Sequence, residues 1–323
     1  MAYTLTVYKN IRDIKDSWIK LSEKCPSATP FQSYEVMELA DRYFFPYYIK
    51  DRSHSEFATI SSSDGNICFI MPLTIRHDKR TESFGNVNGF NYGSFLYSEN
   101  CDIDKCLRLL KSKYGNIHLH NFTQTTINEI ITPPRILNKT INIAIKFGKD
   151  YDTYLHTLSP SVRQNIRTSY NRLKTDGYNL NIIYSSEGDK NNLINECIDL
   201  YCTRHLMRYG VKTSKIKKWF LKNFSFATII YKRAQTALTI AVEINGELAA
   251  FMSGIIKDNI FVVPRLSIND KFKRYSPGII LINESIKHFI AAGQIDTLDL
   301  SRGQEQYKYS MGGEEHYTFD LEI

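Results

Sequence analysis

Apolar residues in the first half of the chain follow spacings typical of strands and of helices. Residues 3–8 alternate like a short strand. Apolar residues then recur at i, i+3, i+7 and i+10, which predicts one buried helix face: Ile11, Ile14, Trp18 and Leu21. Further predicted elements are a helix capped by Ser33 that runs to about Arg42, strands near 58–60 and 67–76, a helix with Ile103, Cys106, Leu107, Leu110 and Tyr114 on one face, and strands at 116–120 and 141–145.

The same kind of pattern starts again after residue 146. Ser159-Pro160 predicts a helix start, with serine as N-cap and proline at the first helical position, and Gly177 predicts the end of that helix. Asn245-Gly246 predicts a tight hairpin turn of type I′. The other predicted elements are strands at 178–184, 227–231, 238–244, 247–256, 260–267 and 297–300, a helix at 190–209, a lysine-rich helix after it, and a helix after Gly278.

Two successive α+β units account for this order of elements. The chain has 323 residues, of which 42% are hydrophobic, so each half is long enough to fill a core of its own. We therefore predict an N-terminal domain at 1–145 and a C-terminal domain at 146–323.

The charge balance favours an anionic partner. A formal net charge of +7 suits a nucleotide cofactor or a sugar phosphate. Nucleic acid is the competing interpretation, but the basic residues are scattered and no zinc-finger or RNA-recognition signature is present. No apolar run approaches the roughly 18 residues of a membrane span. The start of the chain lacks the apolar core of a signal peptide. We expect a cytoplasmic protein.

A basic turn before the helix at Gly278 is the strongest local signal for a ligand. Free amides at a helix N-terminus, together with the helix dipole, attract anions. Gly278 allows a ligand to approach the backbone, and Lys273 and Arg274 add positive charge. This predicts a pyrophosphate site at Ser276-Pro277-Gly278. An ordinary Ser-Pro helix start is the alternative.

Several motifs occur in a familiar order along the chain. They are Phe31-Gln32-Ser33, Arg163-x-x-Ile166-Arg167, the turn from Arg274 to Gly278, and Asp299-Leu-Ser-Arg302-Gly-Gln-Glu305-Gln-Tyr307-Lys308. With them, the sequence resembles the GNAT-like acyltransferases of the CelD type, which are associated with cellulose and exopolysaccharide biosynthesis and are relatives of the Fem peptidoglycan transferases. The resemblance is weak before residue 145 and clear from about 150 to 312.

The resemblance implies a tandem GNAT fold, with two mixed sheets flanked by helices, and an acyl-CoA donor without a metal. The acceptor it implies is an amine on a sugar, amino-acid or cell-envelope precursor. The family's pyrophosphate site maps to Arg274, Ser276, Pro277 and Gly278, and its acceptor-side cluster to Arg302, Glu305, Tyr307 and Lys308. Gln304 departs from the aspartate usual in the family, which puts the identity of the acceptor in doubt.

The acceptor-side residues have definable chemical roles. N-acyl transfer needs a neutral amine, a path for its proton and stabilisation of the thioester oxyanion. Glu305 is suited to accept that proton through water, or else forms an ion pair with Arg302 or Lys308. Lys308 would hold an acceptor carboxylate or phosphate, or neutralise Glu305. Arg163 and Arg167, one helical turn apart, would meet an anionic acceptor or form a solvated face.

Other residues gave weaker signals. His118 and His120 lie on one face of a predicted strand, but no third ligand is near in sequence, so we expect packed histidines and no metal. A group of lysines on a short predicted helix indicates a solvated helix face: Lys212, Lys215, Lys217, Lys218 and Lys222.

Three functions remain open from the sequence. The first is an acyl-CoA-dependent N-acyltransferase whose N-terminal half is a degenerate GNAT unit that shapes the acceptor groove. The second is a Fem-like transferase that takes its acyl group from aminoacyl-tRNA, the one case in which nucleic acid would be a partner. The third is a non-catalytic binding protein on a GNAT scaffold.

Overall fold

A computed structural model describes residues 3–43, 53–85, 90–186, 189–209 and 214–323. The chain divides into two compact units, 1–141 with 316–323, and 142–315. The predicted boundary at 145/146 lies within a strand that runs from Arg135 to Lys146. The last eight residues, which the sequence assigned to the C-terminal domain, belong to the first unit because their strand pairs there with residues 118–123.

The N-terminal unit is a mixed sheet with strand order β1-β2-β3-β4-β6-β13. All neighbours are antiparallel except β4 and β6, which are parallel. Its strands are β1 (Thr4–Tyr8), β2 (His54–Ser61), β3 (Ile67–Ile75), β4 (Thr81–Ser83), β5 (Leu96–Tyr97, paired with β3), β6 (Ile117–Thr123) and the end of β13 (Gly313–Glu322). Its helices are η1 (Ile11–Ile14), α1 (Lys15–Lys24), η2 (Pro30–Gln32), α2 (Tyr34–Tyr43), α4 (Ile103–Tyr114) and α5 (Gln124–Asn128).

Aromatic rings fill the core of this unit. Trp18 is fully buried on the predicted helix face, meets Phe57 edge-on with ring centroids 6.0 Å apart, and donates its indole N–H to the Gln32 carbonyl. Phe95 contacts both Phe69 and Phe122 at centroid distances of 5.0 and 5.9 Å. The predicted periodicity is confirmed here, since Ile11, Ile14, Trp18 and Leu21 are all buried. The hydroxyl of Ser33, the predicted helix cap, instead donates to the Pro30 carbonyl.

The strands of the C-terminal unit follow the order β7-β12-β11-β10-β9-β8, again with both parallel and antiparallel neighbours. Its strands are the end of β7 (Arg135–Lys146), β8 (Leu180–Tyr184), β9 (Ala237–Ile244), β10 (Glu247–Lys257), β11 (Ile260–Ile268) and β12 (Thr297–Arg302). Its helices are α6 (Tyr151–Thr157), α7 (Pro160–Thr175), α8 (Lys190–Tyr209), α9 (Lys215–Phe224), α10 (Phe226–Arg233), η3 (Asp270–Tyr275), α11 (Pro277–Ala292) and α12 (Gln306–Ser310).

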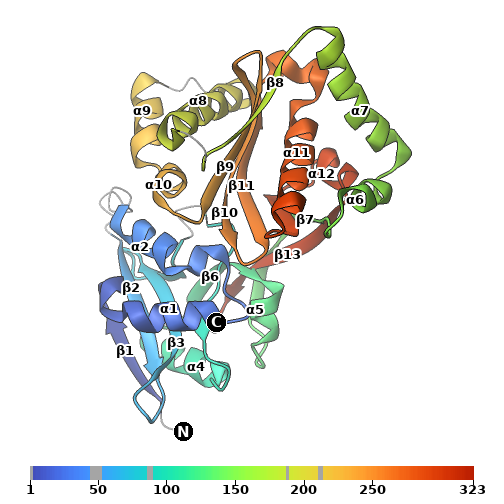
Figure 1. The fold of residues 1–323 in the computed structure, drawn as a ribbon. Coiled ribbons are helices and arrows are strands. Elements are labelled where there is room, and N and C mark those ends of the chain that lie inside the picture. Colours follow the sequence, from blue (N-terminus) through green and yellow to red (C-terminus); the bar gives the residue numbers. More distant parts are fainter. Residues whose placement is uncertain (1–2, 44–52, 86–89, 187–188, 210–213) are drawn as a thin grey trace. The chain divides into compact units, whose positions relative to one another are not determined.

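Helices cover both faces of the sheet strands in this unit. Figure 1 shows α6, α7 and α11 on one side and α8, α9 and α10 on the other. The larger core joins residues of α6, α7 and α11 to the sheet, and a smaller one joins α8 to it. Among the described residues, a parallel strand pair with a helix in its connection occurs in each unit: β4 and β6, connected through β5 and α4, and β11 and β12, connected through η3 and α11.

One predicted strand is wrong. Residues 227–231 belong to helix α10, not to a strand. The apolar run Ile229-Ile230-Tyr231 fits either element by composition, because a short buried run has no decisive period. The hydroxyl of Ser225 accepts the Thr228 amide at 3.3 Å, which is an N-cap that starts a helix at this point. Helices α5, α6 and α12 were not predicted.

Candidate functional site

Strands β11 and β12 pair over only three residues and then separate. The parallel register joins Ile260–Val262 to Thr297–Asp299, whereas β11 continues to Ile268 and β12 to Arg302. Beyond Val262, the pairing of β11 within the described residues is with β10. The result is a wedge between the two strands, which we call the β11/β12 wedge.

A glycine in β10 accompanies this separation. The β10–β11 register shifts between Ser253 and Ile255, and the residue between them is Gly254. A Cβ atom on Gly254 would lie 2.1 Å from the Val262 carbonyl oxygen, so this position accepts only glycine without backbone movement. The bulge thus lies directly beside the last residue of β11 that pairs with β12. A glycine inside a strand is a signal for a bulge that the sequence already carried.

The backbone of β11 presents amides to the wedge. The Asn269 amide donates to the Ala249 carbonyl at 2.8 Å, which fixes the phase of the antiparallel ladder with β10. Alternation along such a ladder directs the N–H and C=O groups of Leu266 and Ile268 away from β10. Pro264 has no N–H, so among residues 264–268 the amides on this side come from Leu266 and Ile268.

The end of β11 leads into the basic turn and helix α11. Ser276 occupies the N-cap position in the left-handed conformation (φ +50°), and its side chain makes no capping hydrogen bond. Pro277 carries no N–H, and no acceptor for the Gly278 amide is found in the described part of the chain. Lys273 and Arg274 are exposed beside it. This turn therefore offers an unsatisfied amide and two cations, as an anion site requires.

Contacts to α7 hold the turn in place. Arg172 donates to the carbonyl of Arg274 at 2.8 Å. Asp176 accepts the Tyr275 hydroxyl at 2.6 Å and lies 3.4 Å from the Arg274 guanidinium. The hydrogen bond to Asp176 raises the pKa of Tyr275 to about 12, so that hydroxyl stays protonated at neutral pH. An added Cβ on Gly278 would lie 3.2 Å from the Ile268 side chain, a tight contact that would require this side chain to shift slightly.

The segment after β12 is organised around Lys308. Its side chain is only 4% exposed. Its ammonium donates to the carbonyls of Leu300, Ser301, Arg302 and Gly303 at 3.0, 3.4, 2.6 and 3.2 Å. It also lies 3.1 Å from the Glu305 carboxylate. With so many acceptors around it, the ammonium of Lys308 holds the turn, and the predicted ion pair with Glu305 is present.

The other residues of the predicted acceptor-side cluster differ in exposure. Arg302 is exposed at the end of β12, and the Glu305 side chain is 48% exposed at the N-cap of α12. Tyr307 packs against the main core of the unit, and burial raises the pKa of its hydroxyl, with the Glu305 carboxylate adding to the effect. Asp299 is buried, and its carboxylate accepts the Ser301 amide at 2.7 Å, which is a structural role.

The two arginines of α7 are differently placed. Arg163 donates to the Leu158 carbonyl at 2.6 Å and to the His156 carbonyl at 3.4 Å, so it closes the C-terminal end of α6. Arg167 is exposed and contacts only its own helix among the hydrogen bonds described, through Gln164. Arg163 is therefore engaged with backbone rather than arranged with Arg167 as a common stripe.

A polar cluster between α6, α7 and α11 was missed from the sequence. Asn283 lies at its centre, accepting from the Tyr151 hydroxyl at 2.6 Å and donating to the Tyr170 hydroxyl at 3.0 Å. Tyr170 also donates to Glu284, which Lys287 contacts at 2.7 Å. Burial and the Glu284 carboxylate raise the pKa of Tyr170. Residues far apart in sequence form this cluster, so no local signal pointed to it, and it fixes α11 on its neighbours.

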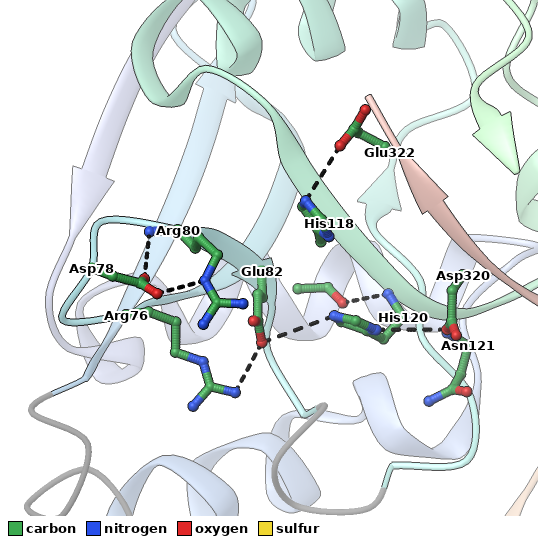
Figure 2. A network of polar contacts seen from close by, with 10 residues as sticks. Arg76, Asp78, Arg80, Glu82, His118, His120, Asn121, Asp320 and Glu322 are labelled. Atoms are coloured by element: carbon green, nitrogen blue, oxygen red, sulfur yellow. Dashed lines mark hydrogen bonds and ion pairs between the residues drawn. The ribbon is translucent and has the colours of Figure 1, made fainter. Parts of the chain in front are cut away.

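The two predicted histidines lie in an acid-rich network of the N-terminal unit. Figure 2 shows His120 between Glu82 of β4 and Asp320 of β13, at 3.9 and 3.6 Å, with Arg76 3.1 Å from Glu82. His118 lies 3.3 Å from the carboxylate of Glu322. No set of three or more His, Cys, Asp or Glu residues suited to a metal occurs among the described residues. The network joins the last strand of the chain to its neighbours.

Comparisons with known proteins agree with this geometry. Residues 160–309 match the family model "Acetyltransferase (GNAT) domain". The structure is similar to one titled "Crystal structure of FemX" (TM-score 0.62, 9% identity, 99% of this chain and 97% of that chain). It is also similar to a tandem GNAT protein from the clavulanic acid biosynthesis pathway (TM-score 0.53, 11% identity, 100% and 98%). A third similar structure is L-PGS from Bacillus licheniformis (TM-score 0.54, 12% identity, 97% and 91%).

Comparison with the sequences of curated proteins gives no further relative. No curated protein matches the chain. The sequence identities to the three similar structures are so low that these similarities support the fold alone. In the described residues, no helix is long and apolar enough to cross a membrane. The predicted fold class is confirmed: the chain has the GNAT fold in a tandem arrangement, and its residues 160–309 match the GNAT acetyltransferase family.

Proposed function

We propose that the protein is an acyl-CoA-dependent N-acyltransferase whose donor binds in the C-terminal unit. The observation that carries the proposal is the β11/β12 wedge followed directly by the basic turn of α11. An extended acyl-pantetheine arm can add to the exposed backbone of β11, where Leu266 and Ile268 offer amides. The pyrophosphate then meets the Gly278 amide with Lys273 and Arg274, and the CelD-type resemblance supports the same donor.

Within its described residues, the N-terminal unit has no matching turn. Its equivalent helix, α4, begins at Asp102, whose carboxylate accepts the Lys105 amide at 3.0 Å. A carboxylate at this position occupies an amide that an anion would need, and it repels a phosphate. We assign the donor to the C-terminal unit alone.

The proposed reaction is attack of an acceptor amine nitrogen on the thioester carbonyl carbon. A C–N bond forms, the C–S bond breaks, and CoA leaves as a thiolate that takes a proton. An amide of β11, with Leu266 the first candidate, donates to the oxyanion. The half-exposed Glu305 carboxylate receives the amine proton through water, while Lys308 holds the turn that carries Glu305. Arg302 and Tyr307 then line the acceptor side.

Thermal unfolding with added ligand tests the donor. A ligand at 100 times its dissociation constant stabilises the folded state by about 2.7 kcal/mol. For a unit of this size, that corresponds to a rise in Tm of about 5–10 °C. We expect this rise with acetyl-CoA, longer acyl-CoAs or free CoA. Gly278→Trp should abolish it, because a large side chain fills the approach to the turn and displaces Ile268.

Ala292→Trp is the matched control, since it places the same side chain on the exposed last turn of α11. It should retain the ligand-dependent rise. Absence of any shift with every CoA species in the wild-type protein would refute the proposal. In that case, retention of aminoacyl-tRNA with a steep dependence on salt would identify the Fem-like donor, and no turnover with either donor would indicate a binding protein.

A further inference from the structure

Helix α9 exposes large apolar side chains on a strongly basic segment. Its sequence, KIKKWFLKNF, contains four lysines and no acidic residue. Ile216 is 79% exposed and Trp219 is 58% exposed. A spacing of three residues places these two side chains on the same side of the helix. Asn223, one turn further along, is exposed as well.

The C-terminal end of α9 is fastened to the rest of the C-terminal unit. Lys222 forms an ion pair with Asp199 of α8 at 2.6 Å. Lys232 of α10 donates to the Lys222 carbonyl at 3.1 Å, and Ser225 donates to the Leu221 carbonyl at 2.8 Å. These contacts hold the C-terminal end of α9 against α8 and α10, and Figure 1 shows α9 as an outer helix beside them.

We propose that α9 is a docking surface for an anionic phospholipid membrane. Helices that lie on membranes combine lysine-rich polar sides with tryptophan and aliphatic residues that enter the headgroup region. Tryptophan is favoured there because its ring is largely apolar and its N–H remains near water. The exposed Lys215 and the basic composition of the segment, which has no acidic residue, complement a negative lipid surface. The exposed aliphatic side chain of Ile216 favours lipid over nucleic acid, whose phosphate backbone offers it no apolar contact.

The proposed docking surface does not depend on the proposed acyl transfer. It places the protein, and with it that reaction, at a membrane surface. A protein that rests on a lipid surface through α9 meets acceptors that carry a lipid chain at high local concentration. The interaction rests on two apolar side chains and a few charges, so it is reversible and sensitive to salt.

The tryptophan content of the chain makes the docking directly observable. The chain has two tryptophans, and the other one, Trp18, is fully buried. A change of tryptophan emission on addition of vesicles therefore reports on Trp219. We expect a shift to shorter wavelength, and quenching by brominated acyl chains, with vesicles of phosphatidylcholine containing 30% phosphatidylglycerol. Pure phosphatidylcholine vesicles should give little change.

Co-sedimentation with the same vesicles gives the affinity of each variant. Trp219→Ser should bind at least tenfold more weakly. Lys215→Gln should bind about fivefold more weakly, the effect of one basic residue near an anionic surface. Two matched controls should bind like wild type: Ile131→Ser, which removes a side chain 86% exposed in the N-terminal unit, and Lys149→Gln, which removes an exposed lysine outside α9.

Three results would overturn the proposal. The first is wild-type protein that does not bind anionic vesicles. The second is an equal loss of binding in the two control variants, which would indicate a general charge effect. The third is a change of Trp219 emission with tRNA at the same salt concentration and none with vesicles, which would assign α9 to nucleic acid. Because Trp219 and Lys215 are exposed, the variants should unfold at the wild-type temperature, which circular dichroism can verify.

Discussion

Replacement of Lys308 by methionine removes the ammonium but keeps an unbranched apolar stem of similar length. In the wild-type protein, that ammonium donates to four consecutive carbonyls and contacts Glu305. Removing one partner of a buried charged group costs about 3–5 kcal/mol, because the remaining groups stay buried without a partner. The carbonyls lie on a turn that water can partly reach, so we expect a value of about 3–4 kcal/mol.

Thermal unfolding by circular dichroism measures this loss. At about 2–4 °C per kcal/mol for a unit of this size, Tm should fall by about 10 °C. Lys308→Gln retains two N–H donors and should lose about half as much. Lys149→Met, on an exposed lysine of the same unit, is the control and should leave Tm unchanged. If Lys308→Met unfolds within about 2 °C of wild type and yet has no transferase activity, the ammonium acts on the substrate and our structural assignment is wrong.

Three further predictions follow from backbone contacts and charge. Gly254→Ala should lower the unfolding free energy by about 3 kcal/mol in urea denaturation, because its Cβ would lie 2.1 Å from the Val262 oxygen. Arg163→Met should cost about 1–2 kcal/mol in the same assay, since it leaves the Leu158 carbonyl without its donor. The imidazole beside Asp320 lowers the pKa of this carboxyl to about 2 from 3.8, so the carboxylate stabilises the fold above pH 4 and the gain is lost as the pH falls toward 2. After solvent screening, this pH-dependent contribution to the unfolding free energy amounts to about 1–2 kcal/mol. The unfolding free energy of Asp320→Asn, measured as the pH is lowered, should not show this loss.

Helix caps, turn residues and hydrophobic period explain which elements of the fold could be predicted from the sequence. The predicted helix at 190–209 has the bounds observed for α8, and Ser159 caps α7 as its Ser-Pro start indicated. The hairpin at Asn245-Gly246 has both residues at positive φ, as a type I′ turn requires. The error at 227–231 arose where the apolar run had no decisive period and the N-cap of Ser225 was overlooked.

Only part of the candidate functional site could be predicted from the sequence. The resemblance to the Fem transferases implied an acceptor-side position for Tyr307-Lys308, with Lys308 either holding an acceptor group or neutralising Glu305. Only the structure shows that the Lys308 ammonium, besides its contact with Glu305, is surrounded by carbonyls from the turn that precedes it. The basic turn at Gly278 could be predicted from the sequence because it is a local feature. Its Ser-Pro helix start, its glycine and its two cationic residues lie close together in the chain.

The sequence by itself indicated most of the longer helices and strands and the basic turn, because capping, hydrophobic period and local charge act over a few residues. Only the tertiary structure decided where β11 separates from β12, since that depends on a register between strands joined through a whole helix and on the bulge at Gly254. It also decided that the last strand returns to the first unit. Both depend on pairing between segments distant in the chain, whose free energy no short stretch of sequence contains.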